Sequence, residues 1–212
     1  MSGVSRETPP PPDVAAGVFS GRLDLAEAYV ARLAGGGIER GLIGPRELPR
    51  LWDRHVLNCA VVATVLPARS RVADVGSGAG LPGVVWAIAR PDIQVTLIEP
   101  LRRRTDFLSE LVAELGLDHQ VEVWRGRAED HAVGYRVVTA RAVAALDKLA
   151  RWCLPLVEPG GCLLALKGSS ARQELADASS TIDRLGGTGA RVTTYGEDIL
   201  PVPTTVIEVD KA

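Results

Sequence analysis

The spacing of hydrophobic residues differs between the first third of the chain and the remainder. From Leu23 to Leu33 the apolar residues recur at helical spacing, and Glu47–Leu66 is a second helical region. We expect Gly35-Gly36-Gly37 to end the first helix and Pro67 to end the second, because glycine and proline disfavour helix interiors. This pattern predicts a short N-terminal helical extension over residues 17–67.

After the extension, short β-rich runs alternate with longer helical runs. The strand candidates are Arg71–Val75, Gln94–Ile98, Val121–Trp124, Arg136–Thr139, Cys162–Leu166, Arg191–Tyr195 and Thr205–Val209. The helical candidates between them are Val84–Ala89, Arg102–Leu115, Ala145–Leu156 and Ser170–Leu185. Such alternation predicts a doubly wound, mostly parallel α/β sheet with helices on both faces, over residues 68–212. Because Gly196–Pro203 is too short for a crossover, the last strand is expected to be antiparallel.

The composition is that of a globular protein. The 212 residues are 46% hydrophobic and 24% charged, enough for one α/β domain with an extension. The 24 basic and 26 acidic side chains give a net charge of −2, which by itself indicates neither nucleic acid nor a membrane as a partner. Residues 1–16 contain four consecutive prolines and no apolar signal segment, so we expect a disordered tail there.

Cysteine usage and hydropathy indicate a reducing compartment. Cys59, Cys153 and Cys162 form no Cys-x-x-Cys pair, so we expect idle thiols and no metal site. The chain has no apolar run of 18 residues or more, and therefore we expect a cytoplasmic protein without a membrane partner. A monomer is the default expectation.

The segment Asp74-Val75-Gly76-Ser77-Gly78-Ala79-Gly80 joins the first strand to a helix. Glycines allow a tight turn and a close approach of backbone to a ligand, which helix-terminal amides can bind. The spacing fits two nucleotide sites, because Gly78–Gly83 also matches the dinucleotide pattern G-x-G-x-x-G. Glu99, at the end of the second strand, suits the ribose hydroxyls of either ligand.

Asp74 favours S-adenosylmethionine over a dinucleotide. It lies two residues before the first glycine, where class I methyltransferases place an acid near the methionine part of the cofactor. The sheet is also expected to end in a hairpin, as in class I methyltransferases, and the chain is too short for a separate hydride-transfer domain. An NAD-dependent oxidoreductase and a non-enzymatic RNA-binding protein on the same fold are the alternatives.

Five runs of sequence together resemble the RsmG (GidB) family. They are Trp52–Asn58, Asp74–Gly83, Arg125–Glu129, Ala140–Val143 and Ala165–Gly168. The family methylates N7 of a guanine, position 527, in 16S rRNA of the bacterial small ribosomal subunit. Two departures lie in the extension: Asn58-Cys59 replaces the usual Asp-Ser, and Gly37–Arg46 replaces an aromatic-Asn-Leu-Thr segment.

The resemblance implies S-adenosylmethionine as cofactor and S-adenosylhomocysteine as product. By position, the cofactor contacts that it implies fall on Gly76, Leu81, Ala128, Glu129 and Arg141. The fold pattern adds Asp74, Gly78 and Glu99 to this set. The ribosomal substrate is also what the resemblance implies, and a methyltransferase for another RNA or for a small molecule stays open.

Thr139–Val143 follows the fourth strand and contains neither an acid nor an Asn-Pro-Pro-aromatic motif. Guanine N7 has an in-plane lone pair and needs no base, so alignment of the reacting atoms can suffice. Lys167 and Arg141 are the catalytic candidates, although a lysine that simply ends a strand in solvent is an equal alternative. The candidates for substrate RNA are Arg54, His55, Arg102, Arg103, Arg125 and Lys167.

Overall fold

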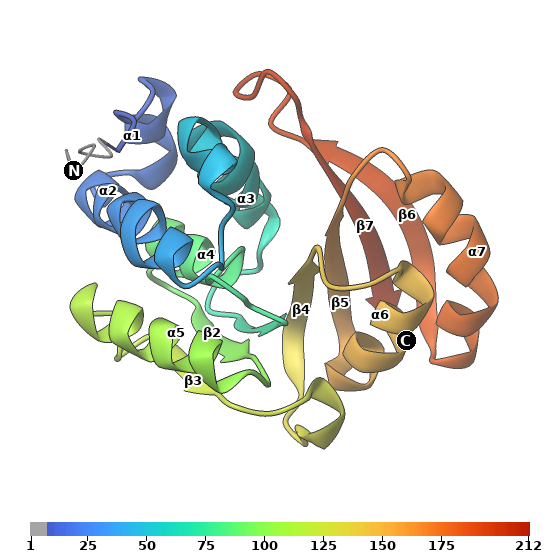
Figure 1. The fold of residues 1–212 in the computed structure, drawn as a ribbon. Coiled ribbons are helices and arrows are strands. Elements are labelled where there is room, and N and C mark those ends of the chain that lie inside the picture. Colours follow the sequence, from blue (N-terminus) through green and yellow to red (C-terminus); the bar gives the residue numbers. More distant parts are fainter. Residues whose placement is uncertain (1–7) are drawn as a thin grey trace.

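A computed structural model describes residues 8–212 and contains one seven-stranded sheet in the order β3-β2-β1-β4-β5-β7-β6 (Figure 1). The strands are β1 Arg71–Val75, β2 Gln94–Ile98, β3 Val121–Trp124, β4 Tyr135–Arg141, β5 Val157–Lys167, β6 Gly187–Tyr195 and β7 Thr204–Lys211. The first five strands run parallel to one another, while β7 is antiparallel to both β5 and β6. The predicted doubly wound, mostly parallel sheet with an antiparallel last strand is confirmed.

Three strands, β1 to β3, begin and end where the sequence predicts, and the other four are longer. The largest difference is in β5, which starts at Val157 and includes Pro159, Gly160 and Gly161. Its register with β4 shifts between Tyr135 and Val137, and Gly160 has a φ of +74°. An irregular, bulged pairing therefore incorporates residues that usually mark a turn.

Helices cover both faces of the sheet (Figure 1). They are α4 Gly83–Ala89, α5 Arg102–Glu114, α6 Leu146–Cys153 and α7 Ala171–Arg184. The extension, α4 and α5 share one hydrophobic core, and α6 and α7 contribute to a second. Within residues 8–212, every helix is too short or too polar to span a membrane.

The first helix of the extension, α1 Val14–Phe19, begins inside the segment expected to be disordered. Residues 1–7 lie outside the described residues, whereas residues 14–16 of the expected tail belong to α1. Trp52 Nε1 donates to the carbonyl oxygen of Pro9 at 2.9 Å. Ala15 and Phe19 are buried, and the Phe19 ring lies edge-on to Trp52 with 6.5 Å between centroids. These apolar contacts order a segment whose prolines favoured disorder.

The three consecutive glycines do not end the second helix. After α2 Leu23–Arg32 the chain continues as a π-helical turn, η1 Leu33–Gly37, and the Arg40 amide still donates to the Gly36 carbonyl at 3.0 Å. A Cβ atom at Gly36 would lie 3.7 Å from the Phe107 ring, so the glycines lie closely under α5. Packing against α5 outweighs their low helix propensity.

The second helical region is confirmed, although it combines 3-10, π and α-helical segments. It consists of η2 Pro45–Arg50, η3 Leu51–Leu57, α3 Asn58–Ala60 and η4 Val61–Val65. Trp86 of α4 donates from Nε1 to the Cys59 carbonyl at 2.8 Å, and Thr204 Oγ1 donates to the Asn58 carbonyl at 2.7 Å. The region is thus joined to the sheet through both α4 and β7.

Candidate active site

The glycine turn has backbone conformations that side chains disfavour. Gly76 and Gly78 have φ values of +72° and +58°. A Cβ atom at Gly76 would lie 2.7 Å from Val143 Cγ2, so the loop after β4 covers this glycine. Tyr29 of α2 is fully buried and donates from its hydroxyl to the Ala79 carbonyl at 3.0 Å. The turn is therefore held from two sides, by the extension and by the loop.

Asp74, the last polar residue of β1, is completely buried below this turn. Its Oδ2 accepts a hydrogen bond from the Gly83 amide at 2.9 Å, which fixes the start of α4. Oδ1 is buried and has no hydrogen-bond partner among the described residues. Burial raises the pKa of Asp74 to about 7. Asp74 thus braces the turn and keeps one oxygen available to a donor.

Glu99 follows β2 and is also buried. Its Oε2 accepts from the Gly78 amide at 3.1 Å, and Oε1 accepts from the Leu101 amide at 3.1 Å. Arg104 Nη1 donates to the same Oε2 at 3.4 Å. Oε1 keeps a second lone pair, so Glu99 can still accept from a ribose hydroxyl. The glycine turn and this acid, expected together from sequence, are joined by a direct hydrogen bond.

Ala128 and Glu129 lie beyond β3, in the short 3-10 turn η5 Ala128–Asp130. Ala128 is buried, whereas Glu129 is exposed. Both line a small pocket of about 270 Å³ near α6. Leu81 is buried in the glycine turn, and its peptide bond to Pro82 is cis.

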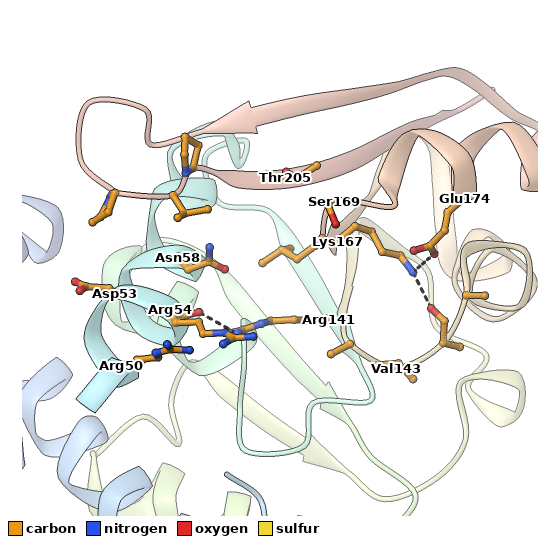
Figure 2. Close-up of a pocket in the computed structure, with 18 residues that line it drawn as sticks. Arg50, Asp53, Arg54, Asn58, Arg141, Val143, Lys167, Ser169, Glu174 and Thr205 are labelled. Atoms are coloured by element: carbon orange, nitrogen blue, oxygen red, sulfur yellow. Dashed lines mark hydrogen bonds and ion pairs between the residues drawn. The ribbon is translucent and has the colours of Figure 1, made fainter. Parts of the chain in front are cut away.

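A larger pocket, of about 1260 Å³, opens at the carboxyl edge of β4 and β5 (Figure 2). The extension forms one wall, the loop after β4 and the end of β5 form a second, and the β6–β7 loop forms a third. Its lining residues are Arg50, Asp53, Arg54, Asn58, Arg141–Ala145, Leu166–Ser169, Glu174, Pro201–Pro203 and Thr205. No residue of the glycine turn lines it. Val143 lies between the two, because it lines the pocket and contacts Gly76.

Arg141 ends β4 and extends toward the extension (Figure 2). Nη2 donates to the Arg54 carbonyl at 3.0 Å and lies 2.9 Å from His55 Nδ1. Nη1 lies 3.4 Å from the His55 carbonyl and 3.2 Å from Cys59 Sγ. The four terminal N–H groups are therefore all directed at protein acceptors, which makes Arg141 a fixed positive charge in the pocket wall.

Lys167 ends β5 and extends in the opposite direction, toward α7 (Figure 2). Its Nζ donates to Glu174 Oε2 and to the Ala144 carbonyl, both at 2.7 Å, and only 9% of its side chain is exposed. The alternative of a lysine in solvent is wrong. Glu174 also accepts from the Leu146 amide at 3.1 Å. The pair therefore fixes the end of the Val143 loop that leads into α6.

The remaining basic candidates do not gather in one place. Arg54 lines the large pocket, and His55, in the same turn, lies behind Arg141. Arg102, Arg103 and Arg125 are exposed after β2 and β3, outside the large pocket, and Arg102 Nε lies 3.7 Å from Asp106 Oδ2. The candidates thus form two groups, one on each side of the glycine turn.

Sequence reasoning missed several pocket residues. Arg50 and Glu174 lie on helices whose pocket-facing side no local pattern marks, and Pro201–Pro203 belong to a hairpin loop. The Pro-Val-Pro run in that loop was the one sequence signal for an exposed apolar residue beside the pocket. Val202 is indeed 76% exposed.

The glycine turn and its acids fit S-adenosylmethionine. The turn leaves no space for a side chain at Gly76, Glu99 offers a buried carboxylate beside it, and Asp74 has an oxygen without a partner. Solved structures share the fold. One is an S-adenosylmethionine-dependent methyltransferase, SibL in its apo form, with a TM-score of 0.62 and 17% identity over 94% of this chain and 77% of that one. Fold and site define a class I S-adenosylmethionine-dependent methyltransferase.

Comparison with sequence families specifies which methyltransferase this is. The profile of the GidB family, described as rRNA small subunit methyltransferase G, matches residues 22–199, and the chain belongs to this family. A relative from Salinispora tropica, named Ribosomal RNA small subunit methyltransferase G, is 56% identical over 99% of this chain and 90% of its own length. One of the same name from a Nocardioides species is 58% identical over 97% and 83%.

Proposed function

We propose that this enzyme transfers the methyl group of S-adenosylmethionine to N7 of a guanine in 16S rRNA of the small ribosomal subunit. The observation that carries the proposal is a pocket of about 1260 Å³ that is lined by Arg50, Arg54 and Arg141 and adjoins the glycine turn across Val143. Three arginines suit the phosphates of a nucleotide. The names of the relatives give the class of RNA.

The glycine turn and Glu99 would hold the cofactor, with Asp74 accepting from its ammonium group. When bound, S-adenosylmethionine supplies a methyl group on a positively charged sulfur and leaves as S-adenosylhomocysteine. Ala128 and Glu129, after β3, would border the adenine. Leu81 would contribute backbone along the turn.

The chemistry requires alignment more than proton transfer. Guanine N7 attacks through an in-plane lone pair, so no residue has to remove a proton first. The chain has to hold N7, the methyl carbon and the sulfur in line. A cation at N7 itself would block the nucleophile, so the fixed charge of Arg141 suits O6 or a phosphate. Lys167 would act on the same site through the loop that it holds.

The exposed arginines outside the pocket suit phosphates farther along the RNA. Arg102, Arg103 and Arg125 would contact backbone on the β2–β3 side, which positions RNA without reading its sequence. The enzyme would work as a monomer in the cytoplasm, where ribosomal subunits are found.

The test is transfer of labelled methyl to small subunits from cells that lack this activity, followed by mapping of the modified base. We expect label at guanine N7, with loss on Glu99→Ala and Arg141→Ala. Arg172→Ala, an exposed arginine on α7 outside both pockets, is the control and should retain full activity. Absence of label on subunits and on free 16S rRNA, despite cofactor binding, would exclude the ribosomal substrate but not the methyltransferase class.

A further inference from the structure

We propose that Glu47 and His55 are positioning residues that orient the Arg141 guanidinium in the pocket wall through a directional hydrogen-bonded chain. The inference rests on the proposed function, because it gives Arg141 its place beside the target nucleotide. Glu47 comes from η2, His55 from η3 and Arg141 from β4, so the chain joins three elements. Glu47 lies outside the five runs of sequence that resemble the family.

The geometry fixes the direction of each hydrogen bond. Arg141 Nη2 lies 2.9 Å from His55 Nδ1, and a guanidinium can only donate. Nδ1 must therefore accept and carry no proton. The other ring nitrogen, Nε2, lies 2.9 Å from Glu47 Oε2, which accepts. Only the neutral tautomer protonated at Nε2 satisfies both contacts.

The charges around the imidazole maintain this neutral form. Burial lowers the pKa of His55, and the positive charges of Arg141 and Arg54 lower it further, while Glu47 opposes them. Cys59 of α3 lies beside Arg141 on the same side. Protonation would place a hydrogen on Nδ1, facing the guanidinium, and break the contact. The chain is thus intact at neutral pH and is lost as the pH falls below the usual histidine range.

The contact with His55 decides how Arg141 is oriented. Without it, Nη2 keeps the Arg54 carbonyl, and Nη1 keeps the longer contacts to the His55 carbonyl and Cys59 Sγ. The guanidinium would then stay near the pocket but turn more freely. Loss of orientation should lower kcat.

Two substitutions of His55 separate the two hydrogen bonds. An asparagine places a polar atom near the position of Nδ1 and keeps an acceptor for Arg141, whereas a glutamine reaches the position of Nε2 and keeps only the contact with Glu47. We expect His55→Asn to retain kcat within about threefold and His55→Gln to lose about tenfold, the typical effect of one hydrogen bond. The wild-type kcat should also fall at acidic pH, and His55→Asn should lack this fall.

Equal loss of kcat in both variants would show that the ring serves packing alone and would overturn the proposal. Retention of full kcat by His55→Gln would overturn it as well. Cofactor affinity, measured by calorimetry, should stay at the wild-type value in His55→Asn, which keeps an acceptor for Arg141. A loss of affinity in that variant would locate the effect at the glycine turn instead of Arg141, and would contradict the inference.

A measurement on the ring itself does not depend on the substrate. The chain has three histidines, so nitrogen NMR of the full-length protein can resolve each ring, and His55 is assigned by its absence in His55→Asn. We expect a protonated Nε2 and an unprotonated Nδ1 at pH 7. Glu47→Gln should weaken this preference, and the exposed Glu39→Gln should not.

The NMR result separates the inference from the proposed function. A ring protonated at Nδ1 at pH 7 would overturn the inference even if subunits are methylated. The expected tautomer in an enzyme that fails to methylate subunits would leave the chain of hydrogen bonds standing and exclude the substrate.

Discussion

At the scale of single residues, the glycine turn has no room for a side chain at Gly76. An L-residue in the left-handed region costs about 1–2 kcal/mol, and Gly76 has a φ of +72°. Gly76→Ala would add a Cβ atom 2.7 Å from Val143 Cγ2. We expect a lower melting temperature and a loss of S-adenosylmethionine affinity of at least tenfold, measured by calorimetry.

Gly78 provides a matched control for this prediction. It also has a positive φ, but a Cβ atom there would meet nothing closer than the Gly76 carbonyl oxygen, at 3.8 Å. Gly78→Ala should therefore show the backbone strain alone and be the milder variant. Val143→Ala should recover part of the Gly76→Ala defect. If it recovers none, Val143 does not limit the turn.

Asp74 makes stability depend on pH. Its pKa of about 7 in the folded state exceeds the ordinary value of 3.8, so between these values the folded protein binds more protons than the unfolded one. Protonated Asp74 contributes its full stabilisation when the pH is below the ordinary pKa of 3.8. This stabilisation is lost as the pH rises toward 7. The loss should be on the order of 4 kcal/mol.

Asp74→Asn should remove that dependence. The amide oxygen can accept from the Gly83 amide, and the NH₂ group takes the place of Oδ1, which has no partner among the described residues. We expect urea unfolding of the cofactor-free protein at pH 5 and pH 8 to differ less for the variant than for the wild type. An equal difference would assign the pH dependence to another group.

At the scale of elements, the ion pair of Lys167 and Glu174 joins β5, α7 and the loop after β4. The pair is mostly buried, so removal of one partner should cost about 3 kcal/mol, because the other charge is left without compensation. We expect Lys167→Met to lower both stability and kcat, as measured by urea unfolding and methyl transfer.

The double variant decides between a structural and a catalytic role for Lys167. Lys167→Met with Glu174→Met removes both charges and should recover most of the stability. If kcat recovers too, Lys167 acts by holding the loop. A kcat that stays at the level of the single variant would indicate direct contact between Lys167 and the substrate.

Periodicity predicts elements well when one local rule applies. The strands β1 and β2 are runs of mostly buried residues between clear breaks, and β3 is a short run rich in valine. The bounds of all three match the prediction. The sequence misleads where tertiary packing overrides a local preference, as when Gly35–Gly37 continue a helix beneath Phe107. It also misleads where Gly160 and Gly161 enter β5 through a bulge.

The candidate site was predictable from sequence only where a local rule applies, as for the fold. The glycine turn and Glu99 follow from a local motif and from the rule that parallel strands end at one edge, so sequence brings them together. The hydrogen bonds of Arg141 were beyond reach, because its partners lie 82 to 87 positions away in the extension. For the same reason, the sequence does not show that Lys167 pairs with a glutamate on α7.

At the scale of the whole molecule, the extension and the sheet share a core. Tyr29, Leu33 and Leu51 are fully buried in the same cluster as α4 and α5. A fragment of residues 68–212 would expose the face of α4 that they cover. We expect it to be insoluble, or to bind a hydrophobic dye and unfold without cooperativity. A soluble fragment with a cooperative transition would show that the sheet folds alone.

The hydrogen bond from Thr204 to Asn58 spans 146 positions of the chain. At about 5–20 residues per second, roughly 7–30 seconds of synthesis separate the two residues. The helices of the extension therefore leave the ribosome well before the strand that completes their contacts. During that interval the apolar faces of these helices are exposed to solvent. The nascent chain can therefore bind chaperones, or misfold, while it is still attached to the ribosome.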